Sequence, residues 1–469
     1  MKTFILIPFH LLVLLIACQT VAEAQDAPRP NIIFIMADDL GYGDLSCYGQ
    51  TNWQTPVLDG MAQRGLMFSD AYAGSTVCAP SRASLMTGMH NGHTWIRANG
   101  RIALRPGEDI TIAQVLKRAG YHTAMIGKSS LACNSDDQEL SHQMGFDYFF
   151  GFLAHAAAHH YYPKQLFRNV AGRTSVVEYP NNQLHEGEHY SSDLFLADTR
   201  AYLKAVAQRD EPFFLLYASQ LSHASLCVPE RWIEPFRGKF DEVSVPQRHY
   251  RGTDEPKATY AGMVTRLDWE VGQLLDQLEE LGLSDNTLII FMSDNGSMNE
   301  GGFQRAWFNS SGPLRGGKRD LYEGGIRSPM IAYWPGQIAP GKTDLPTANW
   351  DIFPTLAELA GAEYSHEIDG LSLVPTLLGS GEQPTHDYLY WEFHEQGGKQ
   401  AVRVGTWKGV RLNCKRDADA PIELYDLSRD PGEANNIAAR HPAVVRQIRR
   451  IMAEAREPHP RFPFAADRP

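Results

Sequence analysis

The sequence predicts an α/β protein in which helices sandwich a mainly parallel central sheet, followed by a smaller C-terminal α+β domain. Short apolar runs at residues 30–37, 212–218 and 287–293 have the composition of strands buried on both faces. Stretches with helical spacing lie between these runs, and such alternation is typical of a parallel sheet. From about residue 376 the pattern changes to short strand-like segments without intervening helices. We therefore expect a catalytic domain over residues 29–375 and a small domain over 376–460.

The elements of the first domain follow in order. Residues 110–119 have helical spacing and are followed by a turn and a strand over 120–127. A helix at 202–209 precedes the strand at 212–218, and the longest predicted helix spans 260–281. Its apolar stripe consists of Val264, Leu267, Val271, Leu274, Leu275 and Leu278. Functional residues of such a fold belong at the carboxyl edge of the sheet.

The second domain is predicted to pair antiparallel strands under one helix. Residues 387–393 and 400–412 read as strands joined through a glycine-containing turn, and residues 442–457 read as the covering helix. Residues 461–469 carry no folding signal, so we expect a loose tail.

Composition excludes some functions. The chain has 469 residues, 43% hydrophobic and 21% charged, which suits a globular protein with a large core. Its formal net charge of -12 argues against nucleic acid as a partner, because phosphate binding depends on clustered basic residues. Six cysteines are too few for a disulfide framework at this size, although one or two disulfides remain open.

The N-terminus predicts export. Residues 1–24 combine Lys2, a short apolar stretch and the small-residue pattern Ala22-Glu23-Ala24, as in a cleaved signal peptide. This indicates a periplasmic or secreted protein. Alternatively, the run ending in Cys18 is a lipobox, and the mature protein is anchored through that cysteine. No later run is long and apolar enough for a transmembrane span.

Acidic and amide side chains follow two of the predicted buried strands. Asp38 and Asp39 end the first strand, and Asp294 and Asn295 end the strand at 287–293. Carboxylate and amide oxygens suit hard cations rather than zinc or copper. A helix N-cap pair is the alternative for the two adjacent aspartates. We expect one divalent ion here, Ca²⁺, with Mg²⁺ as the alternative.

The most specific motif is C-x-P-S-R, beginning at Cys78. It resembles the signature of the formylglycine-dependent sulfatases, which belong to the alkaline phosphatase superfamily. In that family the cysteine is oxidised by a maturase to formylglycine, whose hydrate attacks sulfur and later releases sulfate. A buried cysteine beside a proline turn is the plain alternative. The resemblance runs from about residue 29 to about 440 through segments 31–43, 78–88, 120–128, 293–296, 315–318, 323–329 and 423–433.

The resemblance implies a role for each matching residue. The metal ligands would be Asp38, Asp39, Asp294 and Asn295, with the modified Cys78 reaching the same ion. Arg82 would hold the formylglycine hydroxyl, a task that suits a guanidinium with several donors. Lys128 and Lys318 would contact the sulfate oxygens, and His223 would protonate the leaving alcohol.

One position departs from the family pattern. Many sulfatases have a histidine two residues after the motif lysine, assigned as the base that releases sulfate, whereas this chain has Ser130. An unactivated hydroxyl cannot accept a proton near neutral pH. His159 or His160 could replace the missing base, but a contact to the substrate or simple packing is the favoured explanation for both.

The implied function is hydrolysis of a sulfate ester on a carbohydrate of galactose or N-acetylgalactosamine type, because segments 92–97, 146–151 and 159–163 resemble that branch. Trp391 and His394 of the small domain are candidate sugar contacts, although tryptophan in a small sheet is often core. Two alternatives stay open. One is a phosphodiesterase or phosphonate monoester hydrolase on the same scaffold. The other is a catalytically decayed sulfated-glycan binding protein, for which Ser130 is the main argument.

Overall fold

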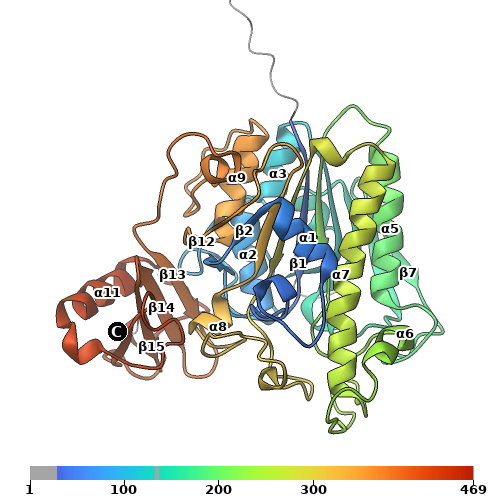
Figure 1. The fold of residues 1–469 in the computed structure, drawn as a ribbon. Helices are drawn as coiled ribbons and strands as arrows, with labels where there is room; N and C mark the ends of the chain where they lie inside the picture. The colour runs from blue at the N-terminus through green and yellow to red at the C-terminus, as the bar shows by residue number, and fades with distance from the viewer. Residues whose placement is uncertain (1–28, 133–136, 468–469) are drawn as a thin grey trace, which may run out of the picture.

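The structure is a computed structural model that describes residues 29–132 and 137–467. A large layered domain carries a smaller sheet on one side, at the left of Figure 1. The predicted signal peptide, Cys18 and Cys133 lie outside the described residues. Within them, no helix is both long and apolar enough to cross a membrane. The cysteines of this part of the chain, Cys47, Cys78, Cys227 and Cys414, are unpaired.

The large domain is built on a ten-stranded sheet in the order β11-β2-β10-β9-β1-β8-β4-β5-β6-β7. Its parallel centre consists of β9 (Thr287–Ser293), β1 (Asn31–Ala37), β8 (Phe213–Ala218), β4 (His122–Ala132) and β5 (Tyr148–Ala154). The strands β10 (Met330–Tyr333), β2 (Leu66–Phe68) and β11 (Gly341–Thr343) extend one edge. The opposite edge is the antiparallel pair β6 (Gln165–Val170) and β7 (Arg173–Glu178). A separate pair joins β3 (Ala71–Tyr72) to β12 (Thr347–Ala348).

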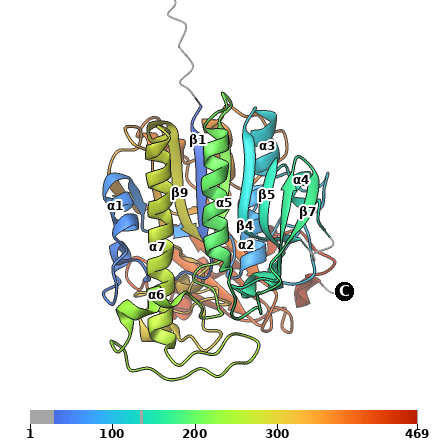
Figure 2. The ribbon, with the colours of Figure 1, turned by 90° about the vertical axis from the view of Figure 1, so that its right-hand side faces the viewer.

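Helices cover both faces of this sheet, as predicted. One face carries α7 (Pro256–Glu280), α5 (Ser191–Val206) and α1 (Pro56–Arg64), of which α7 and α5 cross the front of Figure 2. The other face carries α2 (Cys78–Thr87), α3 (Ile112–Arg118) and α9 (Ile352–Leu359). Alternate side chains of β1 serve the two layers: Ile33 packs into the first and Phe34 into the second. Short helices are α4 (Leu140–Gln143), α6 (Glu230–Ile233), α8 (Glu323–Ile326) and α10 (Val374–Leu378).

The small domain is an antiparallel sheet in the order β13-β14-β15-β16. The strands are β13 (Leu389–Phe393), β14 (Lys399–Val404), β15 (Trp407–Leu412) and β16 (Ile422–Asp426). One face packs under α11 (Pro442–Glu454), where Tyr390 meets Ile448. The other face packs on the large domain, where Phe393 shares a core cluster with Tyr72. The predicted domain boundary falls within α10, ahead of the connection to β13.

The fold class predicted from sequence is confirmed, with two local differences. The helix expected at 202–209 is the end of α5, which begins at Ser191. The expected loose tail is wrong for its described part, because Phe462 and Phe464 are buried. Arg456 also binds Asp467 at 2.6 Å, so the end of the chain packs against the small domain.

Candidate functional site

The site begins where two neighbouring strands of the parallel sheet end. β1 and β9 pair in register, with Ala37 opposite Ser293, so the residues that follow them meet at one edge. The backbone N–H of Asp39 donates to Asp294 Oδ1 at 3.1 Å. Asn295 Nδ2 donates to Asp39 Oδ1 at 2.7 Å. The predicted ligand set is therefore brought together, and all of it is fully buried.

Helix α2 delivers the cysteine of the C-x-P-S-R motif to this edge. Cys78 is the first residue of α2, and every residue of this helix is buried. The Cys78 thiol lies 3.3 Å from Asp38 Oδ1 and 3.4 Å from Lys128 Nζ. Burial, together with the charges of Asp294 and Asp38, raises the pKa of this thiol well above its ordinary value. An unmodified Cys78 is therefore held as a neutral thiol, which is a poor nucleophile.

Three cations surround the carboxylates. Lys128 Nζ, on β4, lies 2.5 Å from Asp38 Oδ2. Lys318 Nζ lies 2.8 Å from Asp39 Oδ2. The Arg82 guanidinium donates to Asp294 Oδ2 through Nε (3.0 Å) and Nη2 (2.8 Å), and through Nη1 to the Lys128 carbonyl. The cations meet in one buried cluster, although their residues are far apart in the sequence.

The oxygen donors fit a hard divalent cation. The buried Asn295 Oδ1 has no hydrogen-bond partner among the described residues. Burial raises the pKa of Asp39, and the nearby Asp294 raises it further against the effect of Lys318. A cation amid these oxygens would relieve both problems. With a divalent cation bound, the ion, the three carboxylates and the three basic groups together would carry a net charge of +2, which favours binding of an anion.

His223 adds an imidazole to the same cluster. It follows β8, and its Nε2 lies 3.4 Å from Asp39 Oδ2 and 3.2 Å from Lys318 Nζ. Burial and the charges of Lys318 and Lys128 lower the pKa of His223. The ring is therefore neutral near pH 7 and would carry an extra proton only when negative charge develops nearby.

The two histidines predicted from sequence, His159 and His160, lie in different surroundings. The ring of His159 stacks on that of His223, with centroids 4.6 Å apart and an angle of 16°. The ring of His160 turns the other way, toward His185 at 5.2 Å. His159 thus belongs to the site, and His160 lies at its margin.

Sequence reasoning missed two residues of the site. Glu300 binds Lys318 at 3.2 Å and Arg319 at 2.9 Å, and these two cations lower its pKa against the effect of burial. His155, at the start of a short 3₁₀ helix over His155–His159, contacts both Ser130 and His159. His155 stands four residues before His159, a spacing that could have drawn attention, whereas no pattern marked Glu300.

The sugar contacts predicted in the small domain are wrong. Trp391 is fully buried between Tyr72 and Trp350, and its indole N–H donates to the Ala73 carbonyl. His394 is also buried, stacked on Phe464 and hydrogen-bonded to Glu392 at 2.8 Å. Both residues serve packing because this face of the sheet is covered.

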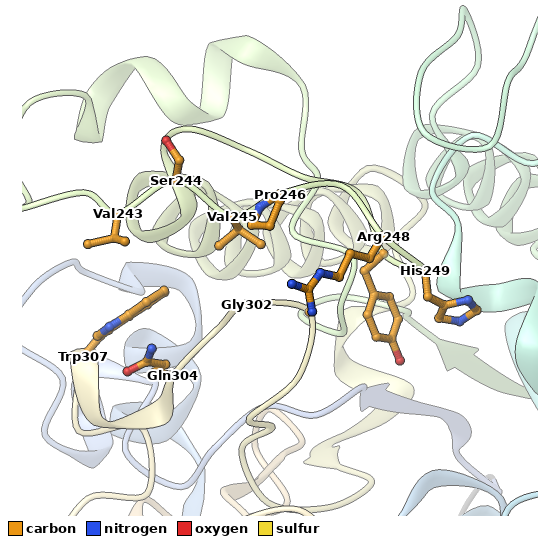
Figure 3. Close-up of a pocket in the computed structure, with 11 residues that line it drawn as sticks. Val243, Ser244, Val245, Pro246, Arg248, His249, Gly302, Gln304 and Trp307 are labelled. Atoms are coloured by element: carbon orange, nitrogen blue, oxygen red, sulfur yellow. The ribbon is translucent and has the colours of Figure 1, made fainter.

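A pocket opens beside the buried cluster. It has a volume of about 480 Å³ and is formed by residues 243–250 and 301–307. Figure 3 shows the Trp307 ring at one end, His249 at the other and the Arg248 side chain between them. Tyr250 connects the pocket to the site, since its ring lies 6.3 Å from that of His223. The pocket combines an aromatic surface with a basic side chain.

A second cluster, His90, His93 and Asp369, is close enough to suggest a metal site. The hydrogen bonds argue against it. Gly92 N–H donates to His90 Nδ1 at 3.1 Å, which leaves the proton of the neutral ring on Nε2, facing Asp369. Burial lowers the pKa of His90 to about 4. These three residues are better described as a hydrogen-bonded structural cluster.

Comparisons with known proteins agree with this geometry. The profile of the Sulfatase family matches residues 30–362, and that of the N-sulphoglucosamine sulphohydrolase C-terminal region matches 316–457. Arylsulfatase A of Homo sapiens is 33% identical over 91% of this chain and 87% of its own length. N-acetylgalactosamine-6-O-sulfatase of Bacteroides thetaiotaomicron is 30% identical over 92% and 94%. The crystal structure of Ps i-CgsB in complex with k-i-k-neocarrahexaose superposes with a TM-score of 0.75 at 29% identity, covering 91% of this chain and 92% of that one.

Proposed function

Because the chain belongs to the sulfatase family, and is thus a sulfuric ester hydrolase, we propose that its substrate is a sulfated carbohydrate of galactose or N-acetylgalactosamine type. The observation that carries the proposal is that two features of the site are connected. A buried cluster with an anion-binding charge balance is linked through the Tyr250 ring, 6.3 Å from that of His223, to a 480 Å³ pocket that offers Trp307 and Arg248. Aromatic faces suit sugar rings, and a guanidinium suits a second anionic group.

The metal in this proposal is one Ca²⁺, with Mg²⁺ as the alternative. Its ligands are Asp38, Asp39, Asp294 and Asn295, together with residue 78. The unpartnered Asn295 Oδ1 and the crowded carboxylates support an oxygen-bound ion at this position. Ca²⁺ accepts a flexible, all-oxygen shell more readily than Mg²⁺ does.

In the proposed reaction, Cys78 is first converted to formylglycine, which supplies a hydroxyl nucleophile where the thiol stands. Arg82 orients that residue while holding Asp294. Lys128 and Lys318 bind the sulfate oxygens and stabilise the charge that grows on them. His223 would protonate the leaving alcohol through Nε2, which faces the cluster beside Lys318. Because Nδ1 faces the Ala224 carbonyl, Nε2 carries a proton only in the charged ring, which forms when the negative charge of the substrate enters the site.

Two further proposals concern the export and the maturation of the protein. Residues 1–24 form a signal peptide that is removed on export to the periplasm or the exterior, or else Cys18 carries a lipid anchor. A maturase that produces formylglycine is the partner during synthesis.

The division into domains at residues 375–376 is likewise proposed. We also propose that His159 and His160 contact the substrate.

The test combines a substrate screen with mass spectrometry of the peptide that contains residue 78. After coexpression with a maturase, we expect this peptide to carry the aldehyde and the protein to release sulfate from sulfated galactose or N-acetylgalactosamine. Cys78→Ala should abolish turnover without changing the melting temperature, whereas Cys414→Ala should retain turnover. A modified protein that cleaves phosphodiesters or phosphonate esters but no sugar sulfate would contradict the proposal. A modified protein that only binds sulfated glycans would favour the decayed alternative.

A further inference from the structure

Ser130 occupies an unusual position on β4. The pairing of β4 with β5 shifts register between Lys128 and Ala132, as at a β-bulge. Ser130 lies within this shift and has a φ of 57°, in the left-handed region. A bulge redirects side chains. Ser130 is buried two residues after Lys128, whose Nζ contacts both Asp38 and the Cys78 thiol.

The partner of the redirected hydroxyl is His155. Ser130 Oγ lies 3.2 Å from His155 Nδ1. On the other side of the ring, His155 Nε2 lies 3.3 Å from His159 Nε2. The two ring nitrogens of His155 are therefore both engaged, and the imidazole is held in one orientation between the bulge and the ring that stacks on His223.

The charges around His155 come from several elements. They are Lys128 on β4, Arg82 on α2, Lys318 from the loop before α8, and the neighbouring His159. Burial lowers the pKa of His155 well below its ordinary value, and these groups lower it further. The ring therefore stays neutral near pH 7, and its Nδ1 can accept a proton, which the Ser130 hydroxyl alone cannot do. The lowered pKa makes His155 a weaker base than a free imidazole until the negative charge of bound sulfate offsets the nearby cations.

We propose, on the basis of the proposed function, that Ser130 and His155 act together as the proton acceptor that frees sulfate from residue 78. The bond between that carbon and the sulfate oxygen breaks, and its electron pair leaves with sulfate. The second hydroxyl on the same carbon gives its proton to Ser130 Oγ, and its O–H electron pair forms the new C=O bond. The Ser130 proton passes to His155 Nδ1. His155 is thus a positioning and proton-storing residue that acts through Ser130.

This assignment replaces the two histidines considered from sequence. His159 stacks on His223 and faces His155 through Nε2, so it orients His155. His160 turns toward His185. Of the three, His155 makes the hydrogen bond to Ser130.

The first experiment separates sulfate release from the earlier step. In His155→Gln and Ser130→Ala, turnover should fall about a hundredfold, because general base catalysis contributes about that much or more. Mass spectrometry during turnover should find sulfate retained on the residue-78 peptide. The matched control is His185→Gln, which removes a histidine that lies against His160 and should leave both readouts unchanged. Full turnover in His155→Gln would overturn the proposal.

The second experiment exchanges the two groups. The double variant Ser130→His with His155→Ser places the imidazole on β4 and the hydroxyl behind it. It should recover turnover to within about tenfold of the original protein, whereas His155→Ser alone stays low. The acid limb of the pH profile, where turnover rises as the base loses its proton, should lie below pH 6.5 because the pKa of His155 is lowered, and it should disappear in His155→Gln and return in the exchanged protein. A double variant as slow as the singles, with an unchanged melting temperature, would contradict a shared role.

The third readout needs neither formylglycine nor activity. In the unmodified Cys78 protein, a histidine NMR titration should find His155 neutral at pH 6, and Ser130→Ala should shift its pKa. An unaltered His155 pKa would exclude the Ser130 contact. A wild-type protein inactive on every sulfate ester would instead refute the proposed function, so the two failures can be told apart.

Discussion

Two buried charge clusters of this molecule use the same residue types for different ends. At the site, burial raises the pKa of both Asp39 and Asp294, and the Asn295 oxygen has no partner among the described residues. At the junction between the domains, Glu323 is equally buried, yet Lys408 and Arg327 lower its pKa against the effect of burial. A buried carboxylate that is satisfied by cations, such as Glu323, contributes to architecture, whereas crowded carboxylates beside an unpartnered amide oxygen are suited to bind a cation.

At the junction both oxygens of Glu323 have partners, whereas Oε1 of the neighbouring Glu433 has no hydrogen-bond partner among the described residues. Glu323 Oε1 accepts from Lys408 Nζ at 2.6 Å, and Oε2 accepts from Tyr72 Oη and Arg327 Nε, both at 2.7 Å. Arg403 then joins the small sheet to Asp70 at 2.8 Å. Lys408 and Arg403 belong to the small domain, while Glu323 and Asp70 belong to the large one. The network therefore fixes one domain on the other.

The largest expected effect concerns the proposed Ca²⁺ site. Asp39→Asn should weaken Ca²⁺ binding at least about hundredfold and abolish turnover, because a charged ligand is lost. The stability of the metal-free protein should change little, since crowding among the carboxylates is relieved. Calcium titration calorimetry and melting curves in a chelator test this. Strong destabilisation of the metal-free variant would mean that the two clusters do not differ as described.

Glu323→Gln should have the opposite effect: it should destabilise the protein and leave Ca²⁺ binding unchanged. Removing one partner from a buried ionic cluster leaves uncompensated charges and costs about 3–5 kcal/mol of the free energy of unfolding. Denaturant unfolding measures this loss. The folded fraction should bind Ca²⁺ as the original protein does, and exposed Glu454→Gln on α11 is the control. An unchanged unfolding midpoint would show that the network does not hold the domains.

A smaller effect should appear with pH at the junction. Burial raises the pKa of Glu433 from 4.5 to about 7, so the folded state binds its proton more tightly than the unfolded state does. The associated stability is complete below pH 4.5 and is lost as pH rises toward 7, by up to about 3 kcal/mol. Glu433→Gln should remove this part of the pH dependence. Unfolding curves between pH 4.5 and 8 measure it, and parallel curves for both proteins would contradict it.

The smallest effect belongs to an exposed cation. Arg248 lines the pocket beside the site, where water screens its charge. Arg248→Gln should raise the KM for an oligosaccharide with a second anionic group by about tenfold, or 1.4 kcal/mol, with kcat unchanged. Arg446→Gln, on the solvent side of α11, is the matched control. Equal KM values for substrates with and without the second group would exclude this role.

Sequence predicted the site better than its surroundings. The buried runs ending in Asp38 and Asp294 have simple periodicity, and the parallel pairing of β1 and β9 follows from it. The short edge strands β2 and β11 and the last strand β16 carry too few residues for a pattern and depend on their neighbours. Trp391 was misassigned because burial of one face of a small sheet is decided by what packs on it.

The site residues hardest to predict from sequence were those whose partners lie in other segments of the chain. Glu300 and His155 meet Lys318 and Ser130 only after distant segments come together. Ser130 was recognised as a departure, but its compensating partner depends on a bulge that no sequence pattern marks. The residue-by-residue resemblance predicted the reacting groups that we propose, and the three-dimensional packing showed which residues lie around them.

The complete burial of α2 has a consequence for the order of events in the cell. Cys78 has no exposed surface in the folded chain, since the strand ends and Lys128 enclose it. An oxidising enzyme could not grip this segment once the sheet had formed around it. The conversion of Cys78 proposed above would therefore have to precede folding, while the polypeptide is still extended, and a chain that folded first would keep its unmodified thiol.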